Sequence, residues 1–592
     1  MKIKSESLYL QIDREIDYGM RNLTPAEIEA VERLGTTAED WSTIHVAEDF
    51  RPEQLQQSRL GGTVELQSGA RIIRSYVANY RIGARTLIEQ ITALQCREST
   101  TFGNGVGVAT MNECEGRKVH ICDTMSAQVA YMMAIYRHRP QLIQRLEALV
   151  DAVAESRRDT LGTIGEDCHI SGARFLREVR IGNRVTIDGA SALTNGTILD
   201  DAFVGVDVKA YDFIACEGSR MANGATIERC FVGESCILDK GFTAADSLFF
   251  ANSHCENGEA AAIFAGPYTV SHHKSSLLIA GMFSFFNAGS GSNQSNHLFK
   301  SGAVHQAVHP RGCKFASGAY IMAPALEGAF TMVMGHHSRH HDTSVFPYSY
   351  LLEKEERSFL LPAVNLTSYG TVRDMEKWPK RDKRKVQRDV INFEAHNPYT
   401  TGSMLRAVDM LHTIEEMNPD SPVYTYNRVQ IRAAALQRGL TLYNRAIVGS
   451  LGEMLERGGS TERYNGAGRW VDIAGQYLTK QAVDRIVEQI EQGELATLQA
   501  IDNAFRVFAV HYDDYAHSWA EQVYGSLLGH TPSVEELQEA IEAGRNARES
   551  FRRMTDTDRT RDCGADMAVS YGLDCDTPEE RMADFRTVRG LN

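Results

Sequence analysis

The chain has 592 residues, of which 43% are hydrophobic and 23% charged, and its formal net charge is −15. One hydrophobic core seldom grows beyond about 250–300 residues, so this length predicts several cores or one elongated array. The acidic balance excludes the broad basic surface of a general nucleic-acid binder, and we expect no nucleic-acid partner.

Neither a membrane span nor a secretion signal is predicted. No run of about 18 apolar residues occurs, and Glu6, Asp13 and Glu15 interrupt the only segment where a signal peptide could lie. The eleven cysteines are scattered without a CxxC pair, which is typical of small buried residues in a reducing compartment. We therefore expect a cytoplasmic protein that does not interact with membranes.

Residues 1–58 are predicted to form a helical and irregular segment before the main fold. Thr24 is a candidate N-cap, Pro25 suits the first turn, and Glu27 completes a capping box. Gly35 follows at the distance expected of a helix end. One helix is therefore predicted between these residues.

The strongest pattern is an apolar residue at every sixth position. Four blocks show it: Ile82, Ile88 and Leu94; Ile164, Ile170 and Leu176; Ile181, Ile187, Leu193 and Leu199; Val232, Leu238 and Ala244. A period of six fits neither a helix of 3.6 residues per turn nor strand alternation, but it suits a solenoid with three short flat faces. The pattern predicts coils of about 18 residues, first over 59–100 and then, as the main β-helix, over 161–355.

Helices are predicted in two places. Residues 101–160 interrupt the repeat with apolar spacings of three and four, and Pro140 lies at a plausible helix start, which predicts an inserted helical hairpin. Residues 356–592 are predicted to form a C-terminal helical domain, with a capping box at Ser533 and Glu536 and a tail that holds a short helix near Pro578.

The six-residue pattern resembles the hexapeptide repeat of the left-handed β-helix superfamily. That superfamily is dominated by acyltransferases that use acyl-CoA or acyl-carrier-protein, and it includes the γ-class carbonic anhydrases. The whole chain also resembles the large hexapeptide-repeat proteins of Bacteroidetes-type bacteria. The resemblance implies a left-handed parallel β-solenoid, a homotrimer and, for the acyltransferase branch, a sugar or sugar-nucleotide substrate.

Ten of the nineteen histidines lie between residues 250 and 345, together with several asparagines. His254 and His272 are eighteen residues apart, and His273 and His309 are thirty-six apart, as are His305 and His341. Coils of about eighteen residues would place the members of each pair on the same face. We therefore expect these groups to gather in a single pocket.

Acyltransferases of the superfamily typically use a histidine to deprotonate the acceptor, and imidazole suits this task at neutral pH. The candidates for this base are His272, His273 and His305. Sugar hydroxyls or phosphate would be bound by Asn287, Asn293, Asn296, His297 and Lys300. Lys274 or Arg311 would bind an anionic group.

Two other functions remain open. A His-ligated metal would make the protein a lyase or hydrolase of the γ-carbonic-anhydrase-like type; no ligand set is favoured, but His305, His309, His337 and His341 are the candidates. A non-catalytic oligomeric scaffold or sugar-nucleotide-binding protein is the third interpretation. The basic stretch 377–388 is interpreted as a solvated face, with binding of a phosphate-rich ligand as its alternative.

Overall fold

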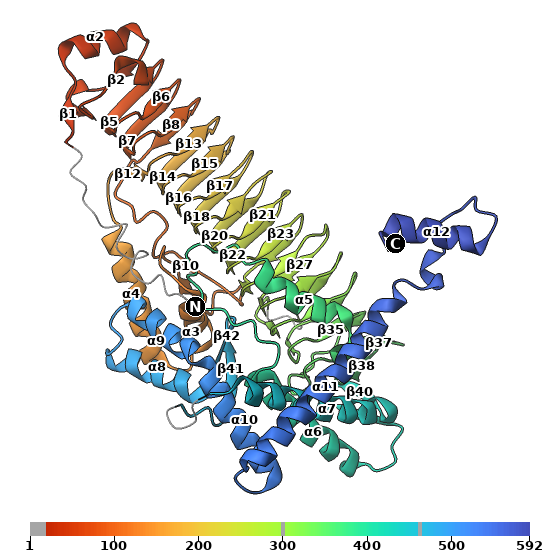
Figure 1. Ribbon diagram of the computed structural model, residues 1–592. Coiled ribbons are helices and arrows are strands. Elements are labelled where there is room, and N and C mark those ends of the chain that lie inside the picture. Colours follow the sequence, from red (N-terminus) through yellow and green to blue (C-terminus); the bar gives the residue numbers. More distant parts are fainter. Residues whose placement is uncertain (1–18, 298–301, 460–463, 592) are drawn as a thin grey trace.

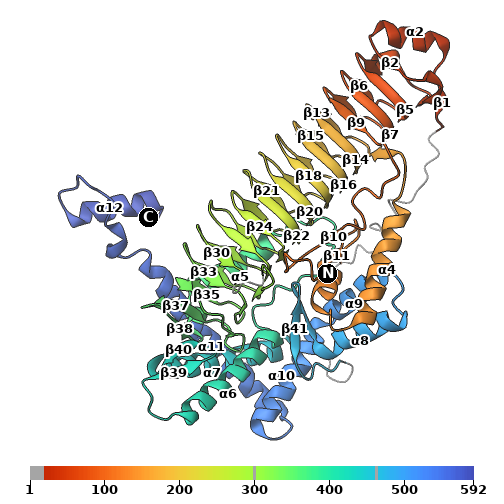
Figure 2. The ribbon, with the colours of Figure 1, turned by 180° about the vertical axis from the view of Figure 1, so that it is seen from behind.

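The computed structural model describes residues 19–297, 302–459 and 464–591. A parallel β-solenoid forms its long axis, and helices from an insertion and from the C-terminal region pack along one side and at one end (Figures 1 and 2). The predicted fold class, a parallel β-solenoid with a helical insertion and a helical C-terminal region, is thus confirmed. Among the described residues, no helix is both long and apolar enough to traverse a bilayer.

Between residues 162 and 249 the coils stack with a step of 17 residues. Ile164, Ile181, Ile198, Ala215 and Val232 occupy one continuous row of paired strands: β12 (Gly162–Ile164), β14 (Phe175–Ile181), β16 (Ala192–Ile198), β18 (Lys209–Ala215) and β20 (Thr226–Val232). The third side of each coil belongs to a second sheet, in which β13 (His169–Ser171) pairs with β15 (Thr186–Asp188). The step is one residue shorter than the predicted eighteen.

The corners of the coil explain the shorter step. Glu178, Arg184, Gly189 and Asn195 have left-handed φ angles of 50°, 54°, 73° and 49°. Their spacing gives sides of six, five and six residues, so one side lacks a residue of the hexad. Left-handed backbone is strained for residues other than glycine, and side-chain hydrogen bonds along the corner support it. Asn195 Nδ2, for example, donates to Asp212 Oδ1 of the next coil at 2.6 Å.

The solenoid begins earlier than predicted. Within the predicted N-terminal segment, β3 (Ile44–Val46) already pairs in parallel with β5 (Arg59–Leu66). Helix α2 (Pro25–Arg33) covers this end of the solenoid (Figure 1), and Thr24 and Glu27 form its capping box. The apolar end of the first coils is therefore shielded from water by a helix that the sequence had located.

The insertion leaves and rejoins the solenoid at a corner. The chain departs after β9 (Ala93–Gln95) and returns at β12, which stacks directly on β7 (Tyr76–Ile82). Between them lie α3 (Ala127–Ile135) and α4 (Pro140–Ser156), with Pro140 in the first turn. Because the coil resumes in register, about sixty inserted residues leave the stack of strands unbroken.

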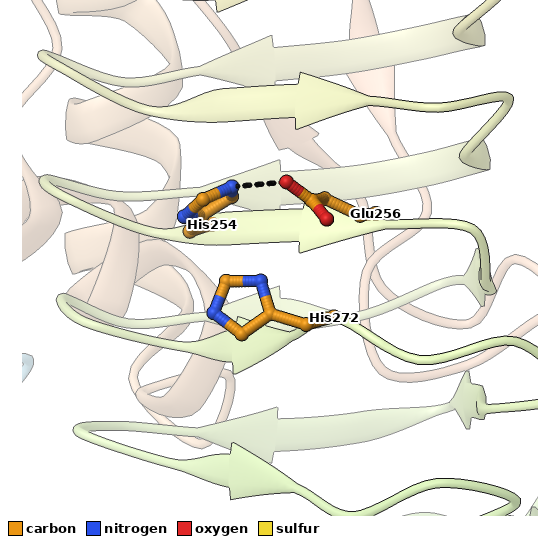
Figure 3. A group of neighbouring side chains, drawn as sticks. All are labelled: His254, Glu256 and His272. Atoms are coloured by element: carbon orange, nitrogen blue, oxygen red, sulfur yellow. Dashed lines mark hydrogen bonds and ion pairs between the residues drawn. The ribbon is translucent and has the colours of Figure 1, made fainter. Parts of the chain in front are cut away.

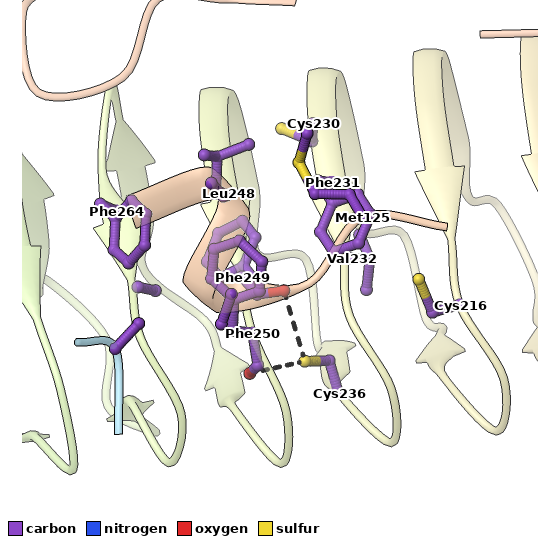
Figure 4. Packing of buried hydrophobic residues seen from close by; sticks show 14 of the residues in the cluster. Met125, Cys216, Cys230, Phe231, Val232, Cys236, Leu248, Phe249, Phe250 and Phe264 are labelled. Atoms are coloured by element: carbon purple, nitrogen blue, oxygen red, sulfur yellow. Dashed lines mark hydrogen bonds between the residues drawn. The ribbon is translucent and has the colours of Figure 1, made fainter. Parts of the chain in front are cut away.

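One outer face of the solenoid is buried beneath the insertion. Phe231, Leu248 and Phe264 alternate with inward-pointing residues, yet they are at most 1% exposed. Figure 4 draws the first two in one buried cluster with Met125 of the insertion, and Tyr131 of α3 contacts Phe264 edge to face. Each fully buried side chain of this size contributes about 1.5–3 kcal/mol, so this face anchors the insertion strongly.

The C-terminal region closes the last coil and then forms helices. The hairpin of β37 (Tyr350–Lys354) and β38 (Arg357–Leu361) extends the solenoid sheet, and a second hairpin, β39 (Val423–Tyr426) and β40 (Val429–Arg432), pairs with it. The helices are α5 (Tyr369–Lys380), α6 (Pro398–Met417), α7 (Ala433–Arg457), α8 (Lys480–Gln492), α9 (Leu498–Val510), α10 (Tyr512–Leu528), α11 (Val534–Arg561) and α12 (Pro578–Arg589). Helices α7 and α11 cross where Gly452 and Gly544 meet, and a Cβ on either glycine would lie 2.6 Å from the other's Cα.

The basic stretch 377–388 is only partly the solvated face that its composition predicts. The side chains of Arg384 and Arg388 are 4% exposed, and both Arg388 Nη2 contacts with the Glu217 carboxylate measure 2.8 Å. Glu234, one coil further along, accepts a hydrogen bond from the Val386 amide at 2.6 Å. The segment therefore binds across successive coils, because repeated acidic residues on the solenoid meet its arginine and its backbone amides.

Candidate functional site

Several of the predicted site residues lie on the outer surface of one sheet. His272 follows β26 (Val270–Ser271) and is half-buried beside His254, whose ring centroid is 4.2 Å from its own. Burial, together with the positive charge His254 would carry, lowers the pKa of His272 to about 4, so His272 is neutral at pH 7. His273, Lys274 and Asn287 are exposed to solvent. Asn287 belongs to β29 (Asn287–Ala288), which pairs with β26 in the same sheet.

The remaining predicted asparagines and histidines do not join them. Asn293 lies in β30 (Asn293–Ser295), which pairs with β33 (Tyr320–Met322) in another sheet. Asn296 is buried and donates to Glu113 of the insertion. His297 is exposed, His305 is half-buried, and Lys300 lies outside the described residues. The predicted polar groups are thus divided between different faces of the solenoid.

Arg311 serves the contact between the solenoid and the C-terminal region. Its guanidinium lies 4.1 Å from the ring centre of Phe285 and 4.2 Å from that of Tyr477. Its Nε contacts Asp472 Oδ2 at 2.6 Å, and its other nitrogens donate to the carbonyl groups of Asn392 and Gly475. All three nitrogens are occupied by protein groups, so Arg311 does not project into a pocket as predicted.

The coil length explains why the predicted pocket does not form. In the part of the solenoid that carries these histidines the step is irregular: it is 16 residues from His254 to Val270, 18 from Glu259 to Leu277 and 26 from Gly281 to Ala307, so a constant interval of eighteen does not bring all of the pairs together. The step between Phe283 and His309 is 26 residues, because more residues separate β30 from β31 than in the regular coils. His273 and His309 therefore lie on different sides of the coil, one after β26 and the other in β31 (Ala307–His309).

A cleft of about 510 Å³ opens instead at the C-terminal end of the solenoid. It lies between β36 (His336–His337) and the two closing hairpins. Its lining residues are His336, Ser338, Arg339, Glu356, Arg357, Ser358, Thr425, Arg428 and Gln430. Three arginines face one glutamate, so the cleft suits an anionic ligand such as a phosphate or carboxylate.

A column of buried polar groups runs through the last coils toward this cleft. Glu327 and His309 are both 0% exposed, and His309 Nδ1 donates to Glu327 Oε2 at 2.6 Å. His341 Nε2 donates to the other carboxylate oxygen at 3.0 Å. Gln294 donates to His309 Nε2 at 2.7 Å. Apolar side chains fill the same space in the earlier coils, so the interior changes character here.

Hydrogen-bond partners orient the two imidazoles around Glu327. His309 Nε2 accepts from Gln294, so the proton that His309 donates to the carboxylate is on Nδ1. His341 Nε2 faces the Glu327 carboxylate, and His341 Nδ1 lies 3.4 Å from the Arg339 carbonyl. Burial alone would raise the pKa of Glu327, but His309 and His341 outweigh it and lower the pKa to about 2.

The column reaches the cleft through His337. Its ring lies 6.1 Å, centroid to centroid, from that of His341. His337 Nε2 donates to the Met334 carbonyl at 3.3 Å, and His337 Nδ1 is 2.8 Å from the Ser358 hydroxyl. Burial lowers the pKa of His337 to about 4, so the ring is neutral at pH 7 and Nδ1 accepts the hydroxyl proton.

The four histidines considered as possible metal ligands lie toward the same end of the solenoid, but they do not form a metal site. Within the part of the chain that the structure describes, three ligand atoms lie within 4.8 Å of one another only at His254, Glu256 and His272. His309 and His341 bind opposite oxygens of Glu327, and His337 binds Ser358. Three of the candidate ligands, His309, His337 and His341, are thus engaged in hydrogen bonds with protein groups.

Sequence reasoning missed Glu327, Ser358 and the arginines of the cleft. Glu327 had a usable signal, because it is a lone acid in the apolar stretch APALEGAFT and acids are seldom buried without partners. Ser358, Arg339, Arg357 and Arg428 had none, because β38, which carries Arg357 and Ser358, meets Arg339 and Arg428 only after the hairpins fold over the last coil.

Comparison with known proteins places the chain among families without an assigned activity. A family model described as "Domain of unknown function (DUF4954)" matches residues 67–415, and one described as "Domain of unknown function (DUF6819)" matches residues 453–592. A protein of Treponema pallidum (strain Nichols), described as "Uncharacterized protein", is 25% identical over 460 residues. The match covers 67% of this chain and 62% of that relative's length.

Proposed function

We propose that this chain, which belongs to the DUF4954 family, is a transferase that moves an acyl group in the arginine-lined cleft, with Ser358 as nucleophile and His337 as its general base. The observation that carries the proposal is the 2.8 Å contact between Ser358 Oγ and His337 Nδ1 at the wall of that cleft. A hydroxyl bonded to an oriented, unprotonated imidazole is the arrangement that activates serine in covalent catalysis.

The remaining contacts of His337 support this role. The Met334 carbonyl holds the proton on Nε2 and so directs Nδ1 to the serine. As His337 takes up a proton, burial and His341 oppose its developing charge, whereas the Met334 carbonyl and the carboxylate of Glu327 favour it. His337 is buried and Ser358 half-buried, so the base is shielded from water while the nucleophile borders the cleft.

The proposed reaction has two steps. In the first, Ser358 Oγ attacks the carbonyl carbon of an acyl thioester, its proton passes to His337 Nδ1, the carbon–sulfur bond breaks, and the leaving thiolate takes that proton. In the second, an acceptor hydroxyl attacks the acyl-serine ester and gives its proton to His337 Nδ1. The proton then returns to Ser358 Oγ as the ester bond breaks. A positioned base of this kind contributes about 10²–10⁴-fold to the rate.

The charge of the cleft favours a phosphate-bearing substrate. Arg339, Arg357 and Arg428 line it, and guanidinium groups bind phosphate oxygens in a bidentate manner. Both predicted substrate classes, an acyl-CoA donor and a sugar-nucleotide acceptor, carry such phosphates. The proposal keeps acyl transfer to a sugar from the sequence prediction, but it moves the base from His272, His273 or His305 to His337. Acyl-carrier-protein as donor and the homotrimer stay predictions.

A serine-reactive fluorophosphonate probe tests the nucleophile directly. We expect the full chain to be labelled at Ser358, as identified by mass spectrometry of the labelled peptide, and Ser358→Ala to abolish labelling. Ser338→Ala is the matched control, because Ser338 lines the same cleft whereas the His337 imidazole binds the Ser358 hydroxyl. His337→Gln should slow labelling at least 100-fold. Circular dichroism establishes that each variant is folded.

The substrate class is tested separately. Acetyl-CoA and UDP-glucose should each raise the melting temperature of the full chain, and Arg357→Gln should reduce the shift.

Labelling that persists in Ser358→Ala, or that falls equally in Ser338→Ala, would refute the catalytic role. If labelling is confirmed but neither compound shifts the melting temperature, the nucleophile stands and the phosphate-bearing substrate is wrong.

A further inference from the structure

A second cluster of polar side chains lies on the outer surface of the solenoid, several coils away from the cleft. His254 and Glu256 belong to β23 (His254–Glu256), and residues two apart on a strand point to the same side. Strand β26 pairs with β23 so that Val270 is opposite His254 and Ser271 opposite Cys255. The next register position brings His272 opposite Glu256, and Figure 3 shows the three side chains on one surface.

The three side chains are close enough to bind one ion. His254 Nε2 is 2.8 Å from Glu256 Oε1, and the rings of His254 and His272 meet edge to face. One ligand atom from each residue lies within 4.8 Å of both others. The Glu256 side chain is 12% exposed and that of His254 31% exposed, so the cluster is recessed yet open to solvent.

We propose that His254, Glu256 and His272 bind a divalent transition-metal ion of the Zn²⁺ class. Two imidazole nitrogens and one carboxylate oxygen are a ligand set for Zn²⁺, Co²⁺ or Fe²⁺, whereas Mg²⁺ and Ca²⁺ prefer oxygen ligands alone. Three protein ligands leave at least one coordination position for water or a small ligand. The site is independent of the proposed acyl transfer, because it shares no residue with the cleft.

Neighbouring groups hold the ligands in place. Lys240 Nζ contacts Glu256 Oε2 at 2.6 Å, which leaves Oε1 as the oxygen that faces the imidazoles. Asn257 donates to the His272 carbonyl at 3.1 Å and so fixes the turn that carries this histidine. Such outer contacts orient metal ligands, and their loss typically weakens metal binding 10–100-fold. The ammonium of Lys240 also offsets the carboxylate charge when no ion is bound.

The same sheet contains a natural comparison. His169 Nε2 contacts Glu89 Oε1 at 3.3 Å on the outer surface of earlier coils, but this pair has no second histidine in the three-ligand geometry. A pair of this kind supplies two ligands at most. His273, directly after His272, is exposed and lies outside the three-ligand group. These two histidines provide matched controls for the site.

Metal titration of the full chain tests the proposal. After EDTA treatment and desalting, the protein is titrated with ZnCl₂ against a chromogenic chelator, and CoCl₂ is added in parallel to record its visible absorption. We expect one tight site per chain and a Co²⁺ band, with affinity reduced at least 10-fold and the band lost in His254→Gln and in His272→Gln. His169→Gln and His273→Gln should retain both.

Two results would overturn the proposal. One is the absence of a tight site in the wild-type chain; the other is a site whose affinity and Co²⁺ band survive in both His254→Gln and His272→Gln. Circular dichroism without metal verifies that the variants fold. Glu256→Gln adds a third readout, because an amide keeps the side-chain shape but lacks the negative charge, and we expect its zinc affinity to fall at least 10-fold.

Discussion

The buried carboxylate in the last coils makes Glu327→Gln the most informative single substitution. The variant keeps the size of the side chain but removes the negative charge that binds His309 and His341. It also places an NH₂ group against one of the two imidazole N–H groups that now donate to the carboxylate. Leaving a buried donor without its acceptor costs about 1–3 kcal/mol, and more where the lost acceptor is charged.

The loss of stability in Glu327→Gln should be confined to the last coils of the solenoid. Solenoid coils contact mainly their neighbours, so destabilisation in the last coils should not spread through the whole stack. We therefore expect amide hydrogen exchange in β31 and at Leu326, whose amide donates to the His341 carbonyl, to speed up. A loss of about 3 kcal/mol corresponds to roughly a 100-fold faster exchange. Amides of β20, in the middle of the solenoid, should be unchanged.

Glu355→Gln is the matched control, because the Glu355 side chain is 81% exposed and its ion pair with Lys354 spans 3.9 Å. Exposed pairs of this kind contribute at most about 1 kcal/mol. If Glu327→Gln changes exchange in β31 less than tenfold, the carboxylate does not hold the column together. An equal change in β20 and β31 would contradict the local character of the effect.

The two other predictions concern pH and the contact between solenoid and helices. The pKa of His337 is about 4 in the folded chain against an ordinary 6.5, so the unfolded chain binds more protons between these values. The free energy of unfolding should therefore fall by up to about 3 kcal/mol as pH drops from 6.5 to 4. Urea unfolding of His337→Gln should lack this pH-dependent decrease. Arg311→Met removes the partner of Asp472, which is 9% exposed, and should loosen the 470–479 hairpin by about 3 kcal/mol. Limited proteolysis of this hairpin should accelerate at least tenfold, whereas Arg373→Met, whose parent side chain is 49% exposed, should leave it unchanged.

The elements that rest on local patterns were predictable. The capping residues Thr24, Glu27 and Ser533 begin helices where the sequence placed them, because an N-cap acts within one turn. Pro140 likewise starts α4. The repeated inward residues predicted the solenoid because each coil buries the same positions. Eight of the eleven cysteines are buried, as expected of small apolar residues, whereas Cys114 and Cys563 are exposed and Cys575 is half-buried.

The candidate sites were less predictable, because their geometry depends on sums over many residues. His254 and His272, which the eighteen-residue interval had paired, do lie together with ring centroids 4.2 Å apart, whereas their partner Glu256 follows from strand pairing. The same interval suggested His305 with His341, whereas the structure joins His341 to Glu327. The number of residues per coil varies between 16 and 26 in this region, so a constant interval places distant residues on the wrong side of the coil.

By itself, the sequence determined that this chain winds into a parallel solenoid with an inserted helical hairpin and a helical C-terminal region. These features follow from periodic burial and from capping, which act between residues near one another in the chain. Only the tertiary structure decided that Glu327 is buried between two imidazoles and that Ser358 meets His337. Those contacts depend on coil length and on the hairpins that fold over the last coil, since side chains far apart in sequence meet only where the stacked backbone brings them.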